Sequence, residues 1–311
     1  MTGEGTAAGP RCGFVALLGA PNTGKSTLVN ALTGAKVSIV SPRVQTTRTR
    51  VLGIVMVGDG PDAAQVVLVD TPGIFEPKRR LDRAMVAAAW QGASDADLIA
   101  LLVDARRCER RTDADTARII DGLARENRQA ILLLNKVDLL KRDRLLAVAD
   151  RLNREGPFTD TFMISALTGS GTGDVLDHCA THLPPGPHLF PEDQISDMPE
   201  RLLAAEITRE KLYLNLYREL PYALTVETET WEERDDGSVK IEQTVYVRRD
   251  SQKSIVLGKD GRQVGRVGAA ARAELEALLG RRIHLFLFVK VRDKWQDDPA
   301  RYREWGLDFP A

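Results

Sequence analysis

The sequence predicts two domains: an α/β domain on a mainly parallel sheet with one antiparallel edge strand, and a smaller α+β domain behind it. Three observations predict this division. Short apolar runs alternate with amphipathic stretches up to about residue 183, prolines at 184–187 interrupt the pattern, and the order of elements changes beyond them. With 311 residues the chain is long enough for two cores, since domains usually span ~100–200 residues.

The first domain is expected to contain six strands separated mostly by helices. The strand-like runs are Phe14–Leu18, Val51–Val57, Val66–Val69, Leu98–Val103, Ala130–Leu134 and Thr161–Ile164, and helix-like segments begin near Lys25, Leu81, Asp113, Arg142 and Asp174. Near-continuous hydrophobicity implies strands that are covered on both faces, hence a parallel sheet between helices. Only the turn-forming segment 58–65 separates the second and third runs, which predicts an antiparallel hairpin at the sheet edge.

The second domain should follow a linker at 184–198, where Pro184-Pro-Gly-Pro187 breaks the chain. Its elements run in the order α-β-β-α-α-β: a helix at Glu200–Leu220, strands at Ala223–Trp231 and Lys240–Arg248, a glycine-interrupted helical stretch at Ile255–Leu279, and a strand at Ile283–Val291. We therefore expect a flexible tail at 1–12, a first domain at 13–183 and a second domain at 199–311.

The net charge of −1 excludes a chain-wide attraction to nucleic acid or to anionic lipid. Positive charge is local instead: residues 248–294 hold twelve Arg and Lys against five acids, whereas residues 221–247 hold seven acids and two bases. The three cysteines are scattered, which predicts neither disulfides nor a zinc site and favours a reducing cytoplasm. No apolar run approaches the ~20 residues that span a bilayer.

A glycine-rich segment that follows the first strand and opens the first helix predicts a P-loop. Its backbone N–H groups would face phosphate oxygens, Lys25 would reach the β- and γ-phosphates, and the Ser26 hydroxyl would bind Mg²⁺. The alternative is a glycine-rich turn that carries Lys-Ser by coincidence. The candidate phosphate-binding residues are Gly19, Ala20, Pro21, Asn22, Thr23, Gly24, Lys25, Ser26 and Thr27.

A second strand ends in Asp70-Thr71-Pro72-Gly73. Asp70 there can hold Mg²⁺ through water, and the Gly73 amide can sense the γ-phosphate. In the polar segment Gln45-Thr46-Thr47-Arg48, we favour Thr47 as the threonine that closes over Mg²⁺ when the γ-phosphate is present. The candidate metal ligands are thus Ser26, Thr47 and Asp70, and the candidate catalytic groups are Lys25, Thr47 and Gly73.

The third motif, Asn135-Lys136-Val137-Asp138, follows another strand and predicts the base. A carboxylate at Asp138 can accept hydrogen bonds from both N1–H and the N2 amino group of guanine, a donor pair that adenine lacks. This argues against an ATP-dependent P-loop enzyme. Ser165 and Ala166 follow the last strand and can bring a backbone N–H near the guanine O6. All these motifs stand at carboxyl ends of strands, where open α/β sheets bind ligands.

The basic region contains Gly258-Lys259-Asp260-Gly261 followed by Arg262, between two helical segments. In an α-β-β-α-α-β domain this Gly-x-x-Gly loop predicts a type II KH domain, which clamps about four nucleotides of a single strand. The glycines would let phosphates approach the backbone, and Lys259 and Arg262 would supply charge. Ile255, Val256, Val264 and Val267 would line the RNA-binding groove or the core beneath it, and most of them are expected in the core.

These motifs together resemble those of the bacterial Era GTPases, and the resemblance extends from Phe14 to about Gly306. Further matches lie in the linker and the second domain: Phe190-Pro-Glu-Asp193, Glu206-Ile-x-Arg-Glu-Lys211, Leu220-Pro-Tyr222 and Ile255-Val-Leu-Gly-Lys-Asp-Gly261. The resemblance implies a cytoplasmic, GTP-hydrolysing switch that uses GTP, GDP and Mg²⁺. It also implies a KH domain that binds the 3′ end of 16S ribosomal RNA and assists assembly of the small (30S) ribosomal subunit, with peripheral association at the inner membrane.

Hydrolysis is expected to be slow, because Ile74 stands where Ras-like enzymes place the glutamine that orients water. We expect Asn22 either to help coordinate K⁺ or only to shape the loop. We expect a monomer. The alternative function is a membrane-associated regulatory GTPase or scaffold in which RNA binding is secondary.

Overall fold

The computed structural model describes residues 9–43, 46–216 and 220–309, so Gln45 and most of the predicted tail lie outside it. The chain forms two compact units. The first comprises Met1–Ser38, Thr47–Asp197 and Trp305–Ala311, and the second comprises Ile39–Thr46 and Met198–Glu304. The second unit therefore includes a short segment from the first half of the chain.

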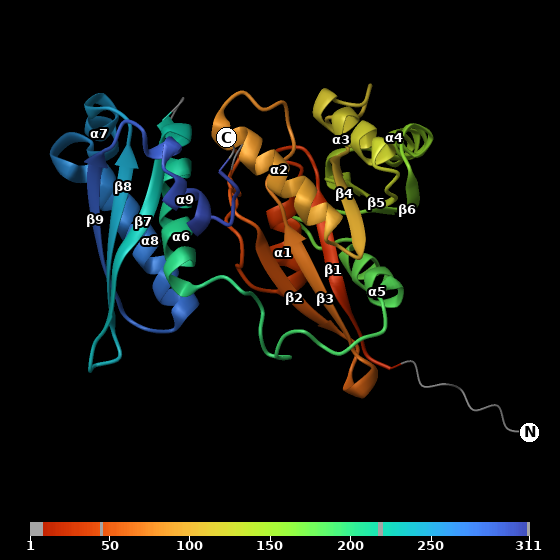
Figure 1. Ribbon diagram of the computed structural model, residues 1–311, viewed down its shortest axis with the longest axis horizontal. Helices are drawn as coiled ribbons and strands as arrows, with labels where there is room; N and C mark the ends of the chain where they lie inside the picture. Colours follow the sequence, from red (N-terminus) through yellow and green to blue (C-terminus); the bar gives the residue numbers. More distant parts are fainter. Residues whose placement is uncertain (1–8, 44–45, 217–219, 310–311) are drawn as a thin grey trace, which may run out of the picture. The chain divides into compact units, whose positions relative to one another are not determined.

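A six-stranded sheet forms the centre of the first unit, in the order β2-β3-β1-β4-β5-β6 (Figure 1). Only β2 and β3 pair antiparallel, from Val51 opposite Asp70 to Val57 opposite Ala64; the other neighbours are parallel. The predicted edge hairpin is confirmed. The strands are β1 (Arg11–Leu18), β2 (Val51–Val57), β3 (Ala64–Asp70), β4 (Leu98–Asp104), β5 (Ala130–Asn135) and β6 (Phe158–Met163).

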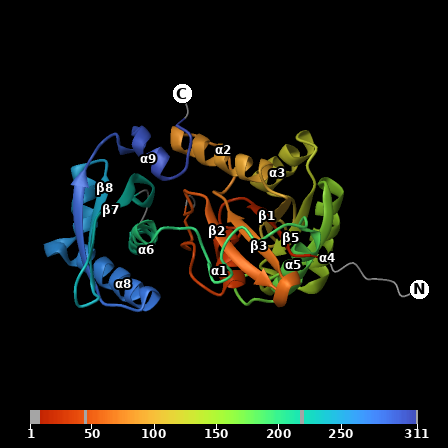
Figure 2. The ribbon, with the colours of Figure 1, turned by 60° about the horizontal axis from the view of Figure 1, so that its bottom comes forward.

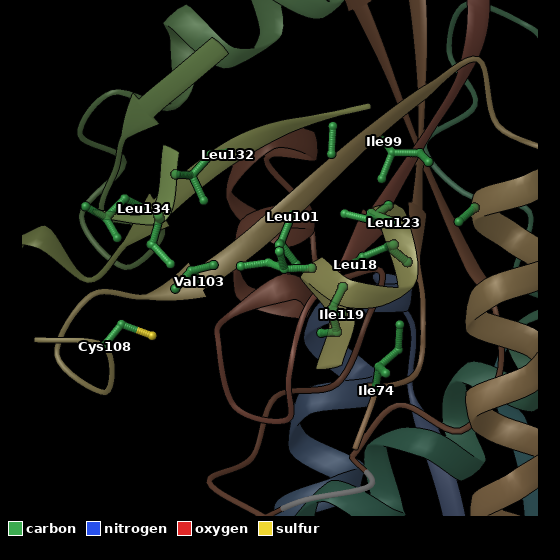
Figure 3. Close-up of a cluster of buried hydrophobic side chains, with 14 of the residues drawn as sticks. Leu18, Ile74, Ile99, Leu101, Val103, Cys108, Ile119, Leu123, Leu132 and Leu134 are labelled. Atoms are coloured by element: carbon green, nitrogen blue, oxygen red, sulfur yellow. The ribbon is translucent and has the colours of Figure 1, made fainter. Parts of the chain in front are cut away.

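Helices cover both faces of this sheet (Figure 2), which explains why its central strands are apolar throughout. One face packs on α1 (Lys25–Thr33) and α5 (Thr172–His182), and the other packs on α2 (Arg80–Ser94), α3 (Ala114–Arg125) and α4 (Arg142–Glu155). Figure 3 shows the second of these cores, where alternate residues of β4 and β5 meet α3.

The second unit is a three-stranded sheet, β7-β8-β9, with three helices on one face. Strand β9 lies parallel to β8 at the edge, and β7 lies antiparallel on the other side. Its elements are α6 (Glu200–Asn215), β7 (Leu224–Glu233), β8 (Val239–Val247), α7 (Asp250–Leu257), α8 (Arg262–Leu279), β9 (Ile283–Val291) and α9 (Pro299–Glu304).

One prediction about this unit was wrong in detail. The helix expected to reach Leu220 ends at Asn215, because Leu216 adopts an extended backbone and is buried in the core of the unit. Among the apolar residues expected to line the groove or the core beneath it, Val256 and Val267 are fully buried, whereas Ile255 is 57% exposed. A short helix has room for only one core-facing residue per turn, and in α7 that residue is Val256.

Within the described residues, the helices are all too short or too polar to cross a lipid bilayer. The cysteines Cys12, Cys108 and Cys179 are buried free thiols. Burial raises the pKa of the Cys179 thiol to about 12, so this side chain packs as a small apolar group.

Candidate functional site

The P-loop connects β1 to α1 and buries the side chain of Lys25. Its ammonium group donates hydrogen bonds to the carbonyls of Gly19 at 3.1 Å and Ala20 at 3.3 Å. Burial lowers the pKa of Lys25 to about 8, although the nearby carboxylate of Asp70 opposes this shift. A desolvated ammonium that is held by two backbone carbonyls keeps a third N–H donor for a phosphate oxygen.

Side chains from β5 hold the P-loop from outside. Asn135 Nδ2 donates to the Thr23 carbonyl at 2.7 Å, and Lys136 Nζ donates to the Asn22 carbonyl at 2.7 Å. Lys136 also forms a 2.6 Å ion pair with Asp104, a buried residue at the end of β4. Asn22 and Lys136 both adopt the left-handed backbone conformation, with φ of 63° and 64°. Such strained residues persist where surrounding contacts over-determine them, often at functional sites.

Four polar side chains converge at the carboxyl end of β3. Asp70 Oδ2 accepts hydrogen bonds from Ser26 Oγ at 2.6 Å, Ser38 Oγ at 2.7 Å and Thr47 Oγ1 at 3.4 Å. The hydroxyl oxygens of Ser26 and Thr47 also lie 2.9 Å apart. The three predicted metal ligands are thus brought together, and Ser38 joins them without having been predicted.

The donor set fits a magnesium ion. Mg²⁺ prefers hard oxygen ligands, and hydroxyl and carboxylate oxygens are what this cluster offers. Asp70 Oδ1 is buried and has no hydrogen-bond partner within the described part of the chain, so one carboxylate oxygen can accept a bond from a metal-bound water. Burial raises the pKa of Asp70 despite the opposing charge of Lys25, and a bound cation would reverse that shift.

The segment after Asp70 packs directly on the P-loop. The Ile74 N–H donates to the Gly19 carbonyl at 3.1 Å. Gly73 lies so close to Pro21 that a Cβ atom there would be 3.0 Å from its ring and backbone, so any larger residue would have to push the two segments slightly apart. The Ile74 side chain is fully buried in the core shown in Figure 3. Ile74 therefore cannot orient a water molecule, as its apolar character already predicted.

The base-recognition residues lie together beyond β5 and β6. Asp138 is exposed, in a short 3-10 turn at Val137–Leu139, so its carboxylate is accessible to a ligand. Asn135 Oδ1 accepts a 2.9 Å hydrogen bond from the Ala166 N–H, and the Ser165 N–H donates to the Ser170 carbonyl at 2.9 Å. Both predicted loop amides thus already donate within the protein, and the bond from Ala166 docks this loop on Asn135.

Asp104 and Ser38 are functional candidates that the sequence reasoning missed. Asp104 had a usable signal, because it is an acid at the carboxyl end of a parallel strand like Asp70. Ser38 had none, since a serine in a polar loop is ordinary. Arg48, next to Thr47, is also buried, and its guanidinium carbon lies 5.9 Å from the Trp305 ring.

The Gly-x-x-Gly loop lies between α7 and α8, as predicted. Gly258 has φ 70° and ψ 179°, a conformation essentially restricted to glycine, and a Cβ there would meet Gln263 Cβ at 2.6 Å. Gly261 is the left-handed N-cap of α8. Lys259, Asp260 and Arg262 are exposed. The loop is thus a turn with exposed charges at the N-terminus of an 18-residue helix, where anions bind favourably.

Gln263 ties this loop to the rest of the second unit, and it too was missed. Its Nε2 donates to the Asn215 carbonyl at 2.9 Å, at the end of α6. This contact holds the first turn of α8 in place. On the strand β9, Phe286 and Phe288 are about half exposed.

The segment Ile39–Thr46 packs within the second unit through polar contacts to α6. Buried Arg209 donates to the Thr46 carbonyl and pairs with Glu206, where its Nε lies 2.8 Å from Oε1. Burial alone would lower the pKa of Arg209, but the charge of Glu206 outweighs burial and raises it. The Val40 N–H donates to Glu210 at 2.8 Å.

Comparison with known proteins identifies both halves of the chain. Residues 14–136 match the family described as 50S ribosome-binding GTPase, and residues 219–296 match the KH domain family. The GTPase Era of Bradyrhizobium sp. is 57% identical over 313 residues, which cover 100% of this chain and 99% of that protein.

Solved structures agree in fold. The structure of an Aquifex aeolicus Era variant bound to GDP.AlF4- has a TM-score of 0.88 and 38% identity, and covers 95% of this chain and 99% of its own. Era in complex with MgGDPNP and nucleotides 1506–1542 of 16S ribosomal RNA has a TM-score of 0.87 and 38% identity, and covers 95% of this chain and 98% of its own. The chain therefore belongs to the Era family of GTPases and hydrolyses GTP.

Proposed function

We propose that this GTPase is a cytoplasmic, monomeric switch that binds the 3′ end of 16S ribosomal RNA and assists assembly of the small ribosomal subunit. The observation that carries the proposal is the exposed Gly258–Gly261 loop, with its flanking basic side chains, in the same chain as a nucleotide site. The RNA bound in a solved Era structure supports the choice of ligand. In this proposal residues 13–183 are the GTPase domain and residues 199–311 the KH domain.

In the nucleotide site, Lys25 binds the β- and γ-phosphates, and backbone N–H groups of the P-loop surround them. Mg²⁺ is held by Ser26 and Thr47, with Asp70 acting through water, and it neutralises charge on the phosphate oxygens. Thr47 senses the γ-phosphate through the metal, since its hydroxyl lies 2.9 Å from that of Ser26 and 3.4 Å from the Asp70 carboxylate. The geometry in support is the convergence of their oxygens around Asp70.

Asp138 selects guanine in this proposal. Its carboxylate accepts from N1–H and the N2 amino group, while Asn135 keeps the neighbouring P-loop and Ser165–Ala166 loop in register. Exposure of Asp138 supports this role, since a carboxylate already committed within the protein could not receive a base.

Hydrolysis is slow without a partner, because the side chain of Ile74 is buried and apolar and cannot orient the attacking water. A backbone group, another residue or the bound ribosomal particle must position that water instead. Asn22 supplies a ligand for K⁺, which adds positive charge beside Lys25. Turnover is expected to fall when Na⁺ replaces K⁺ at constant ionic strength. Equal turnover in both salts would contradict the role of Asn22.

The central test is binding of a 16S 3′-end oligonucleotide by the full-length protein with GTP analogue, GDP or no nucleotide. The double variant Lys259→Glu/Arg262→Glu should lose at least about tenfold in RNA affinity, because two phosphate contacts become repulsive. GTP turnover in the absence of RNA should stay within about twofold of the parent.

The matched control is Arg272→Glu, an exposed arginine further along α8 whose reversal should leave RNA affinity nearly unchanged. Undiminished RNA affinity in the double variant would contradict the assignment of the loop. Sedimentation with anionic vesicles tests the rival function, a membrane-associated scaffold, which requires vesicle binding that the double variant retains.

A further inference from the structure

Three consecutive carbonyls of the P-loop, those of residues 21–23, accept hydrogen bonds from side chains outside the loop. The donors are Arg107, Lys136 and Asn135, at 3.0, 2.7 and 2.7 Å. Because each peptide carries its N–H opposite its C=O, holding these carbonyls outward keeps the N–H groups turned toward the phosphate site. Lys136 and Asn135 belong to the guanine motif, whereas Arg107 belongs to none of the nucleotide-binding motifs.

Arg107 is fixed by two acids at the start of α3. Its Nη2 lies 2.7 Å from Asp113 Oδ1 and 3.8 Å from Asp115 Oδ2. Asp113 is itself the N-cap of α3 and accepts hydrogen bonds from the backbone and side chain of Thr116. Burial alone would raise the pKa of Asp113, but the hydrogen bond from Thr116 and the charge of Arg107 lower it, so the partner of Arg107 stays ionised.

The carbonyl that Arg107 holds belongs to Pro21, where two loops of the site meet. Pro21 packs closely against Gly73, where an added Cβ would lie only 3.0 Å from the proline. The next residue, Asn22, holds the left-handed conformation that L-residues adopt at a cost. A brace at Pro21 therefore acts where the P-loop is both strained and in contact with the Asp70–Gly73 segment.

We propose that Arg107 is a positioning residue for nucleotide binding, which locks the Pro21–Asn22 peptide in its phosphate-facing orientation and is itself aimed by Asp113. Arg107 acts through the loop rather than on the reacting atoms. Its contribution is the same for GDP and GTP, because the Pro21 carbonyl lies on the outer side of the loop. Loss of Arg107 should therefore weaken binding of both nucleotides without changing the chemical step.

The test uses the full-length variant Arg107→Met and the release of a fluorescent GDP analogue. We expect release to become about 5- to 20-fold faster, as for loss of one hydrogen bond from a charged donor. The KM for GTP should rise by a similar factor, and kcat should stay within about twofold. Arg106→Met is the matched control, since Arg106 is the adjacent exposed arginine, and its release rate should equal that of the parent.

The variant Arg107→Gln provides the second arm, since it keeps a polar side chain at a position that is 37% exposed and should fold normally. Its GDP release should also accelerate severalfold. A purely structural role would lower the unfolding temperature of the nucleotide-free protein and leave GDP release unchanged. That outcome would overturn the proposal. GDP release at the parental rate in either folded Arg107 variant would also overturn it, as would equally fast release in Arg106→Met.

Discussion

The nucleotide site and the Gly258–Gly261 loop use one device in two settings. In both, a left-handed glycine is the N-cap of a helix, Gly24 before α1 and Gly261 before α8, and a lysine lies within two residues of it. The lysine of the nucleotide site, Lys25, is 6% exposed, and its loop accepts hydrogen bonds from Arg107, Asn135 and Lys136. Lys259 in the second loop is exposed. The residue that ties this loop to α6 is Gln263, which donates a hydrogen bond to the Asn215 carbonyl.

This difference in burial determines which ligands each loop can recognise. Charges in a buried site act in a low dielectric, and a loop held by hydrogen bonds accommodates few ligand shapes. The nucleotide site can therefore discriminate between ligands. Exposed charges are screened by salt and attract any phosphate chain. The first unit is therefore built for selectivity, and the second for contact with a polyanion.

Asp138→Asn should give the largest effect and tests whether the first site is selective. Two hydrogen bonds to a charged acceptor are lost, so GTP affinity should fall by at least about 100-fold. The affinity of the variant for xanthosine triphosphate should rise relative to its affinity for GTP, because the base of xanthosine triphosphate offers an oxygen where guanine has an amino group. Nucleotide competition measures both.

Asp143→Asn, an exposed acid in the first turn of α4, serves as the control and should keep the parental preference. Unaltered preference for GTP over ATP and xanthosine triphosphate in Asp138→Asn would end the assignment of the base site.

Gly258→Ala should give an intermediate effect and tests whether the second loop depends on its shape. The new Cβ must meet Gln263 Cβ, and the backbone is strained by about 1–3 kcal/mol, so the loop should rearrange. RNA affinity should fall by about tenfold, while GTP turnover remains parental. Gly265→Ala, at a position with open space around it, is the control. Normal RNA binding by Gly258→Ala would show that charge alone suffices.

The pH dependence of GDP binding should show the smallest effect and tests the burial of Lys25. GDP binds the protonated lysine, whose pKa of about 8 in the free protein should rise when a phosphate becomes its partner. Affinity should therefore be nearly constant below about pH 7 and decline above it, by about fourfold between pH 7 and 8.5. The Lys25→Met variant should bind weakly at every pH. A flat profile for the parent would show that the lysine is not desolvated.

Most of the fold was predictable because apolar periodicity is a local property. The six strands and five helices of the first unit lie within a few residues of their predicted positions. The end of α6 was not predictable, since Leu216 suits a helix by composition and leaves it only to join a core made by distant residues. The membership of Ile39–Thr46 in the second unit likewise depends on tertiary contacts.

The candidate site was predictable where one residue type at one spacing does the chemistry, as in the P-loop and Asn135–Asp138. The residues that hold the site residues in place were not predictable. Ser38 and Arg107 act through single hydrogen bonds to Asp70 Oδ2 and the Pro21 carbonyl, 32 and 86 residues away. Nothing in the local sequence marks a serine or an arginine that will meet such a partner.

The chain passes between the two units four times, at residues 38–39, 46–47, 197–198 and 304–305. Removing everything after Asp197 would therefore not yield an intact GTPase domain. The truncated protein would keep Ile39–Thr46 but lose Arg209 and Glu210, which bond that segment, and it would expose Arg48 by deleting Trp305. Biochemistry on an excised half would describe an altered nucleotide site, and each activity is better dissected by point substitution in the whole chain.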